Sequence, residues 1–245
     1  MIEKDDIPKY LLFLENVFPY MDNYNYQKGM KEIIQELKNF LKPKDIGTDS
    51  DRALLLDFQA TLEIKPEKAI KLEKDALAQI ENITADNARL VSNLHANLGG
   101  LYRMNGHPDL AREHMEKSIS LLDQFNLLHI NDSIPQIANY AMFLTEQQEP
   151  ERGISELQKL SGIIKEYHSD DCLDYAKVQE TLGTIYLMTA NLPQAKTHFK
   201  RAFKIYEKIW ADEPEMIEAK YQEIQELYPQ IGFCIGKNLS GLLTK

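Results

Sequence analysis

Apolar side chains recur at every third or fourth position along most of this chain. Leu94, Leu98 and Tyr102 fall on one face of a helix, with polar residues between them. Gly106 stands where that helix is expected to end, because glycine readily adopts the left-handed backbone conformation of a helix C-terminus. Pro108 follows at a position where the next helix can begin without a backbone N–H. The pattern predicts two amphipathic helices joined by a short turn.

The same pair of helices recurs along the chain. Small residues on the second helix of each predicted pair are spaced by 42 residues, at Ala69, Ala111, Gly153 and Ala195. A second series keeps this spacing twelve positions upstream, at Asp57, Gly99, Ala141 and Gly183. A fixed period between about 20 and 50 residues indicates an array of stacked repeats. We expect these small residues to let the two helices of a pair approach closely.

The period assigns a place to each repeat. We expect a degenerate pair at 7–41, repeats at 50–81, 86–124, 133–167 and 172–210, and a capping helix with a tail at 213–245. Each pair leaves an apolar face that only a neighbouring pair can bury. The sequence therefore predicts a single all-α domain over residues 1–245. Its expected architecture is a right-handed superhelical solenoid of about five stacked antiparallel helix pairs with a C-terminal capping helix.

Two of the repeats carry a recognisable motif. They read His95-x2-Leu98-Gly99-x2-Tyr102 with Ala111-x3-Met115, and Gln179-x2-Leu182-Gly183-x2-Tyr186 with Ala195-x3-Phe199. This resembles the tetratricopeptide repeat (TPR), whose pattern is Trp-x2-Leu-Gly-x2-Tyr followed by Ala-x3-Phe. The match is weaker over 133–167 and weakest over 50–81.

The period is longer than the 34 residues usual in that family. It is similar to the long-repeat type found in kinesin light chain and in the peptide-sensing domains of some bacterial regulators. One additional turn on each helix would account for the longer repeat, since a turn takes about 3.6 residues.

Composition narrows the classes of function. The formal net charge of −10 argues against nucleic-acid binding, which normally uses a basic surface. Cys172 and Cys234 match no metal-binding or redox spacing and are expected to be reduced thiols. The apolar run YLLFL near the N-terminus is too short for a signal peptide or a membrane span. We therefore expect a cytoplasmic protein that contacts neither nucleic acid nor membranes and that uses no cofactor or metal.

The resemblance implies that the first helices of the pairs line a concave groove. The candidate groove residues are Asn93, Asn97, Arg103, Asn139, Met142, Lys177, Thr181 and Thr184. Asn97 and Asn139 stand one period apart, and an amide side chain can both donate to and accept from the backbone of an extended ligand. Arg103 and Lys177 could hold a carboxylate of that ligand. The alternative, that the asparagines are only polar positions on a solvated face, stays open at this point.

The sequence favours a binding role. No Ser/His/Asp or Cys/His grouping suited to catalysis is recognisable, so we expect no enzymatic activity. The leading hypothesis is a scaffold that holds an extended peptide or a partner's helix in its groove. Two alternatives are a ligand-sensing domain of a peptide-responsive bacterial regulator and a structural protein that self-associates into a homo-oligomer.

Overall fold

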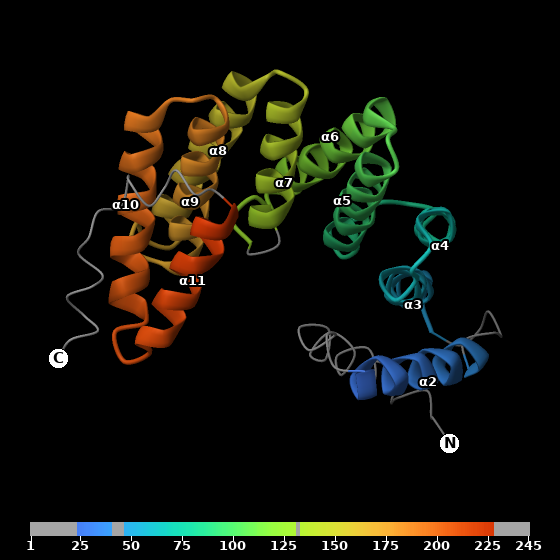
Figure 1. The fold of residues 1–245 in the computed structure, drawn as a ribbon. Coiled ribbons are helices and arrows are strands. Elements are labelled where there is room, and N and C mark those ends of the chain that lie inside the picture. The colour runs from blue at the N-terminus through green and yellow to red at the C-terminus, as the bar shows by residue number, and fades with distance from the viewer. Residues whose placement is uncertain (1–23, 41–46, 131–132, 228–245) are drawn as a thin grey trace. The chain divides into compact units, whose positions relative to one another are not determined.

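The computed structural model describes residues 24–40, 47–130 and 133–227, and every regular element within these ranges is a helix (Figure 1). The helices are α2 (Tyr24–Phe40), α3 (Asp49–Thr61), α4 (Pro66–Leu77), α5 (Ala88–Met104), α6 (Pro108–Gln124), α7 (Ser133–Glu146), α8 (Pro150–Tyr167), α9 (Leu173–Met188), α10 (Leu192–Ile209) and α11 (Pro214–Leu227). The expected helix at 7–20 and the tail from 228 onward lie outside the described residues.

Successive helices form antiparallel pairs, as the 42-residue period predicted. Helix α3 packs on α4, α5 on α6, α7 on α8, and α9 on α10. The all-α fold of repeated helix pairs is therefore confirmed. The chain forms two compact units, one over Met1–Leu127 and the other over Leu128–Lys245. That residues 1–245 form a single domain stays a prediction.

The turn within each pair has the same backbone conformation in three repeats. Gly106 has a φ of 75°, and the residues one and two periods further on, Gln148 and Ala190, have φ values of 65° and 58°. This left-handed conformation ends the first helix and lets the His107 N–H donate to the Tyr102 carbonyl at 2.9 Å. The turn is therefore repeated in geometry, although only one of the three positions carries the glycine that favours it.

The small residues let the helices of a pair come close together, as expected. A Cβ atom on Gly99 would lie 2.6 Å from Met115 Cγ, and one on Gly183 would lie 2.9 Å from the ring of Phe199. The seam is buried: Leu98, Leu182 and their neighbours on the same faces are almost inaccessible to solvent. Each unit thus builds its own core from the apolar stripes of its helix pairs.

The extra length of the repeat is distributed unevenly, which corrects the expectation of one additional turn on every helix. Helices α5 and α6 have 17 residues each, but α3 and α4 have only 13 and 12. In the first repeat the period is kept by the longer connection over residues 78–87 instead. The spacing of the sequence motif fixed the repeat length without fixing where the additional residues would go.

Candidate functional site

The first helices of neighbouring pairs lie side by side within each unit. Helix α3 contacts α5 in the first unit, and α7 contacts α9 in the second. The candidate groove residues divide between these helices: Asn93, Asn97 and Arg103 lie on α5, Asn139 and Met142 on α7, and Lys177, Thr181 and Thr184 on α9. Asn97 and Asn139 therefore belong to different units, and their action on one ligand stays a prediction.

In the first unit, Asn93 lines a cavity of about 210 Å³ between α3 and the start of α5. The other lining residues are Ser50, Asp51, Leu54, Asp86, Asn87, Arg89 and Leu90. Asn93 and Arg103 are both half-buried. Thr48 fixes the end of α3 at this cavity, because its hydroxyl accepts from the Asp51 N–H at 3.1 Å while the Asp51 carboxylate accepts from the Thr48 N–H at 2.7 Å.

Asn97 contacts two carboxyl groups of its own chain. Its Nδ2 donates to Asp57 Oδ1 on α3 at 2.8 Å and to Glu73 Oε1 on α4 at 3.3 Å. The amide thereby joins the second repeat to both helices of the first. Its Oδ1 accepts no hydrogen bond from the residues that the structure describes, so the acceptor half of the amide remains available on an exposed residue.

Asp57 and Glu73 form an acid pair at a position that is apolar in the other repeats. Asp57 stands at the place of Gly99, and Glu73 at the place of Met115. Glu73 is 1% exposed, and burial together with the adjacent Asp57 raises the pKa of its carboxyl to about 10. Burial also raises the pKa of Asp57. Because one proton shared between them would satisfy Glu73 Oε2, which otherwise has no hydrogen-bond partner, the pair is best described as holding a proton at neutral pH.

In the second unit, the candidate residues differ in how far they are accessible. Asn139 and Lys177 are exposed, whereas Met142, Thr181 and Thr184 are half-buried. The two threonine hydroxyls donate to backbone carbonyls one turn earlier on α9, at 3.0 and 3.1 Å. Lys177 Nζ lies 3.8 Å from Asp174 Oδ1, a long contact at the protein surface that is readily exchanged.

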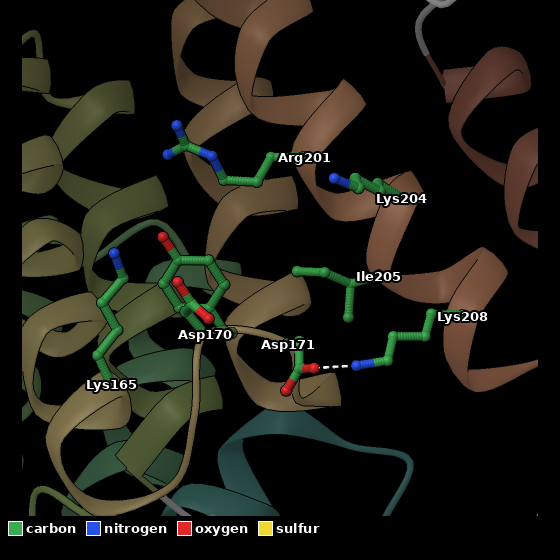
Figure 2. A pocket seen from close by; sticks show the side chains of 8 residues that line it. Lys165, Asp170, Asp171, Arg201, Lys204, Ile205 and Lys208 are labelled. Atoms are coloured by element: carbon green, nitrogen blue, oxygen red, sulfur yellow. Dashed lines mark hydrogen bonds and ion pairs between the residues drawn. The ribbon is translucent and has the colours of Figure 1, made fainter.

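Sequence reasoning missed two polar features. The acid pair could have been found, because Asp57 is the only charged member of its series of small residues. The other feature is a cavity of about 440 Å³ in the second unit, lined by Lys165, Asp170, Asp171, Tyr175, Arg201, Lys204, Ile205 and Lys208 (Figure 2). Three of its four cations recur on α10 at helical spacing, but the fourth, Lys165 on α8, is brought there only by the fold.

Two kinds of site are not found within the described ranges. No group of three or more His, Cys, Asp or Glu side chains there could hold a metal ion. None of the helices there is long and apolar enough to cross a membrane.

Comparison with known proteins identifies the repeat. Residues 133–208 match the family model of the tetratricopeptide repeat. This part of the chain carries tetratricopeptide repeats. These TPR units include the repeat with the strongest sequence motif, at 172–210. No curated protein sequence matches the chain significantly.

Solved structures show the same fold at low sequence identity. A putative kinesin light chain of Podosopora anserina with nearly identical TPR-like repeats is 11% identical and covers 86% of this chain and 99% of its own, with a TM-score of 0.65. BtubC (BKLC) from P. vanneervenii is 17% identical over 84% of this chain and 72% of its own, with a TM-score of 0.55. MamA is 17% identical over 74% of this chain and 91% of its own, with a TM-score of 0.52.

The repeat type carries a general expectation about function. Stacked helical repeats offer extended surfaces that bind other proteins, and TPR proteins are typically scaffolds without enzymatic activity. Protein partners are therefore the class of ligand that the fold indicates.

Proposed function

We propose that this protein is a cytoplasmic, non-enzymatic scaffold that holds an extended peptide or a partner's helix on the face of its first helices. The observation that carries the proposal is the contact between the neighbouring first helices α7 and α9. Asn139 and Lys177 are exposed on these two helices. Polar side chains at such positions contribute nothing to the core, whereas the buried positions of the same helices account for the packing.

Each candidate side chain has a distinct role in this proposal. The Asn139 amide donates to and accepts from one peptide unit of the ligand backbone. The Lys177 ammonium binds a ligand carboxylate in exchange for its long contact with Asp174. Met142 supplies an apolar, adaptable floor, and the half-buried Thr181 and Thr184 hydroxyls accept from ligand N–H groups. In the first unit, Asn93 and Arg103 are proposed to play the same part on α5. Asn97 is proposed only to accept from the ligand through its Oδ1, since its Nδ2 donates to Asp57 and Glu73.

The proposal is tested with peptides selected from a display library on the full chain. Their affinity is then measured by isothermal titration calorimetry for the native chain and for a double variant, Asn139→Ala with Lys177→Ala. We expect the double variant to bind at least about tenfold more weakly, since two charge-assisted or amide contacts together contribute roughly 1–3 kcal/mol.

The matched control is Gln158→Ala, which removes an exposed amide from the second helix α8 and should leave the affinity unchanged. If no peptide is enriched, or if the selected peptides bind the double variant as tightly as the native chain, the first-helix face is not the binding surface.

A further inference from the structure

The second unit of this acidic protein contains a pocket whose charge has the opposite sign. Lys165, Arg201, Lys204 and Lys208 line it together with two carboxylates, Asp170 and Asp171. The lining therefore carries a formal excess of two positive charges, although the whole chain carries a net −10. The pocket therefore attracts anions, whereas the rest of this acidic protein repels them.

Four segments build the pocket: α8, the connection that follows it, the start of α9, and α10. Arg201, Lys204 and Lys208 lie on one face of α10, because they are three, four and seven positions apart. Lys165 comes from the last turn of α8 and stands across the pocket from them (Figure 2). The buried side chains of Tyr175 and Ile205 form its apolar wall. Apart from Tyr175 at the start of α9, the lining comes from second helices and a connection, and it includes none of the candidate residues of the first-helix face.

The cations of the pocket are available to a ligand to different degrees. Lys204 is exposed and forms no ion pair or hydrogen bond with the residues that the structure describes. Arg201 donates from Nη1 to Gln179 Oε1 at 3.3 Å, which leaves most of its five N–H donors unused by that contact. The Lys165 ammonium lies 5.1 Å from the centre of the Tyr175 ring, a contact that fixes its direction without neutralising it.

The fourth cation is already bound by a carboxylate of the protein itself. Lys208 Nζ donates to Asp171 Oδ2, as the dashed line in Figure 2 shows, and this contact lowers the pKa of Asp171. Both groups are largely exposed, with 65% and 48% of their side chains accessible, so exchange for another carboxylate costs little. The contact of Asp171 with Lys208 therefore shows that a carboxylate fits this pocket. The Asp171 carboxylate would compete weakly with a carboxylate of a ligand for Lys208.

We propose that this pocket binds an acidic segment of a partner protein, with the partner's Asp or Glu carboxylates replacing Asp171 on Lys208 and extending to Lys204, Arg201 and Lys165. A cavity of about 440 Å³ accommodates side-chain carboxylates, and its apolar wall suits their methylene stems. The guanidinium of Arg201 can bind one carboxylate through two parallel hydrogen bonds.

The test uses a fluorescently labelled poly-glutamate peptide and the full chain, with binding measured by fluorescence anisotropy at low ionic strength. Poly-glutamate is a sharp probe because the net charge of −10 repels it everywhere except at a basic site. We expect saturable binding that weakens as salt approaches about 0.15 M, where the screening length is about 8 Å. Lys204→Gln should weaken binding about threefold or more.

Two further variants separate the pocket from general effects of charge. Lys196→Gln removes the same charge from another face of α10 and should change the affinity less than Lys204→Gln. Asp171→Asn should tighten binding, since it removes the competitor and releases Lys208. A gain of affinity cannot result from damage to the fold.

The proposal is overturned if poly-glutamate does not bind at low ionic strength, or if Lys204→Gln and Lys196→Gln have equal effects. It is also overturned if Asp171→Asn fails to tighten binding, or if inorganic phosphate displaces the peptide at concentrations that screening alone does not explain. The oligomeric state of the chain without peptide is measured by sedimentation. If the native chain is a dimer and Lys204→Gln is a monomer, the pocket binds a second copy of this chain instead.

Discussion

Gly153 lies where α7 and α8 leave no room for a side chain. A Cβ atom there would be 2.7 Å from the backbone oxygen of Ala141, and a backbone atom cannot move aside as a flexible side chain can. Gly162 lies on the same helix, but a Cβ atom there would meet nothing within 4 Å. The two glycines thus share a helix and differ only in their surroundings.

We therefore expect Gly153→Ala and Gly162→Ala to change stability in opposite directions. Gly153→Ala should lower the free energy of unfolding by roughly 1–3 kcal/mol, because the pair must separate to admit the methyl group. Gly162→Ala should raise it by up to about 1 kcal/mol, since alanine favours a helix interior over glycine. Urea unfolding followed by circular dichroism measures both, and a neutral Gly153→Ala would contradict the close approach of the two helices.

At the scale of the element, two of the repeats share a polar contact between their two helices. His114 Nδ1 lies 2.9 Å from His95 Nδ1, and two periods later His198 Nδ1 lies 2.9 Å from Gln179 Oε1. In both repeats the histidine also stacks on the tyrosine of the motif, Tyr102 or Tyr186. The first pair, α3 with α4, departs from this plan because an acid pair occupies its seam.

The acid pair should make the stability of the first pair depend on pH. The pKa of Glu73 is raised from 4.5 to about 10 by burial and by Asp57, so the folded chain keeps a proton there that the unfolded chain loses above pH 4.5. The contribution of this proton is fully present below pH 4.5 and is lost as the pH rises toward 10. The free energy of unfolding should therefore fall as the pH is raised through that window.

Glu73→Gln isolates this effect, since an amide stays neutral and can donate to Asp57. Compared with the native chain, the variant should lose less stability between about pH 5 and pH 9, by roughly 1–3 kcal/mol. Urea unfolding at both pH values gives the difference. Glu67→Gln, an exposed carboxyl on the same helix, is the control and should keep the native pH dependence. If the free energy of unfolding changes equally with pH in the native chain and in Glu73→Gln, no shared proton is held there.

At the scale of the whole molecule, each of the two units contains complete helix pairs and its own buried side chains. In repeat proteins the contacts that stabilise a pair come from the pair itself and from its immediate neighbours. A cut between pairs should therefore be tolerated, and a cut within a pair should not.

Separate fragments test this directly. We expect fragments 1–127 and 128–245 each to be helical and to unfold cooperatively in a thermal scan followed by circular dichroism. Fragments 1–148 and 149–245 are the control, since that cut separates α7 from α8 and exposes the seam at Gly153. If neither 1–127 nor 128–245 folds, the chain is one indivisible domain. If both fold, the prediction of a single domain over residues 1–245 is wrong.

The helix pairs could be predicted from the sequence because apolar periodicity and small residues at fixed spacing are local signals. Leu98, Gly99 and Tyr102 define a helix face whatever the rest of the chain does, and the resemblance to tetratricopeptide repeats follows from their spacing. The positions of candidate residues on the first helices could be predicted for the same reason. No local pattern predicts which group a polar side chain contacts, because that depends on which helices pack together.

The sequence by itself thus determined the repeat, the pairing of its helices and the small-residue seam, since each arises from residues within about 42 positions of one another. Only the tertiary structure decided that Asn97 joins Asp57 and Glu73, and that Lys165 and Asp171 meet three cations of α10. The physical reason is that burial and charge at a site are set by packing between separate helices. The same side chain would be a solvated surface group on an isolated helix.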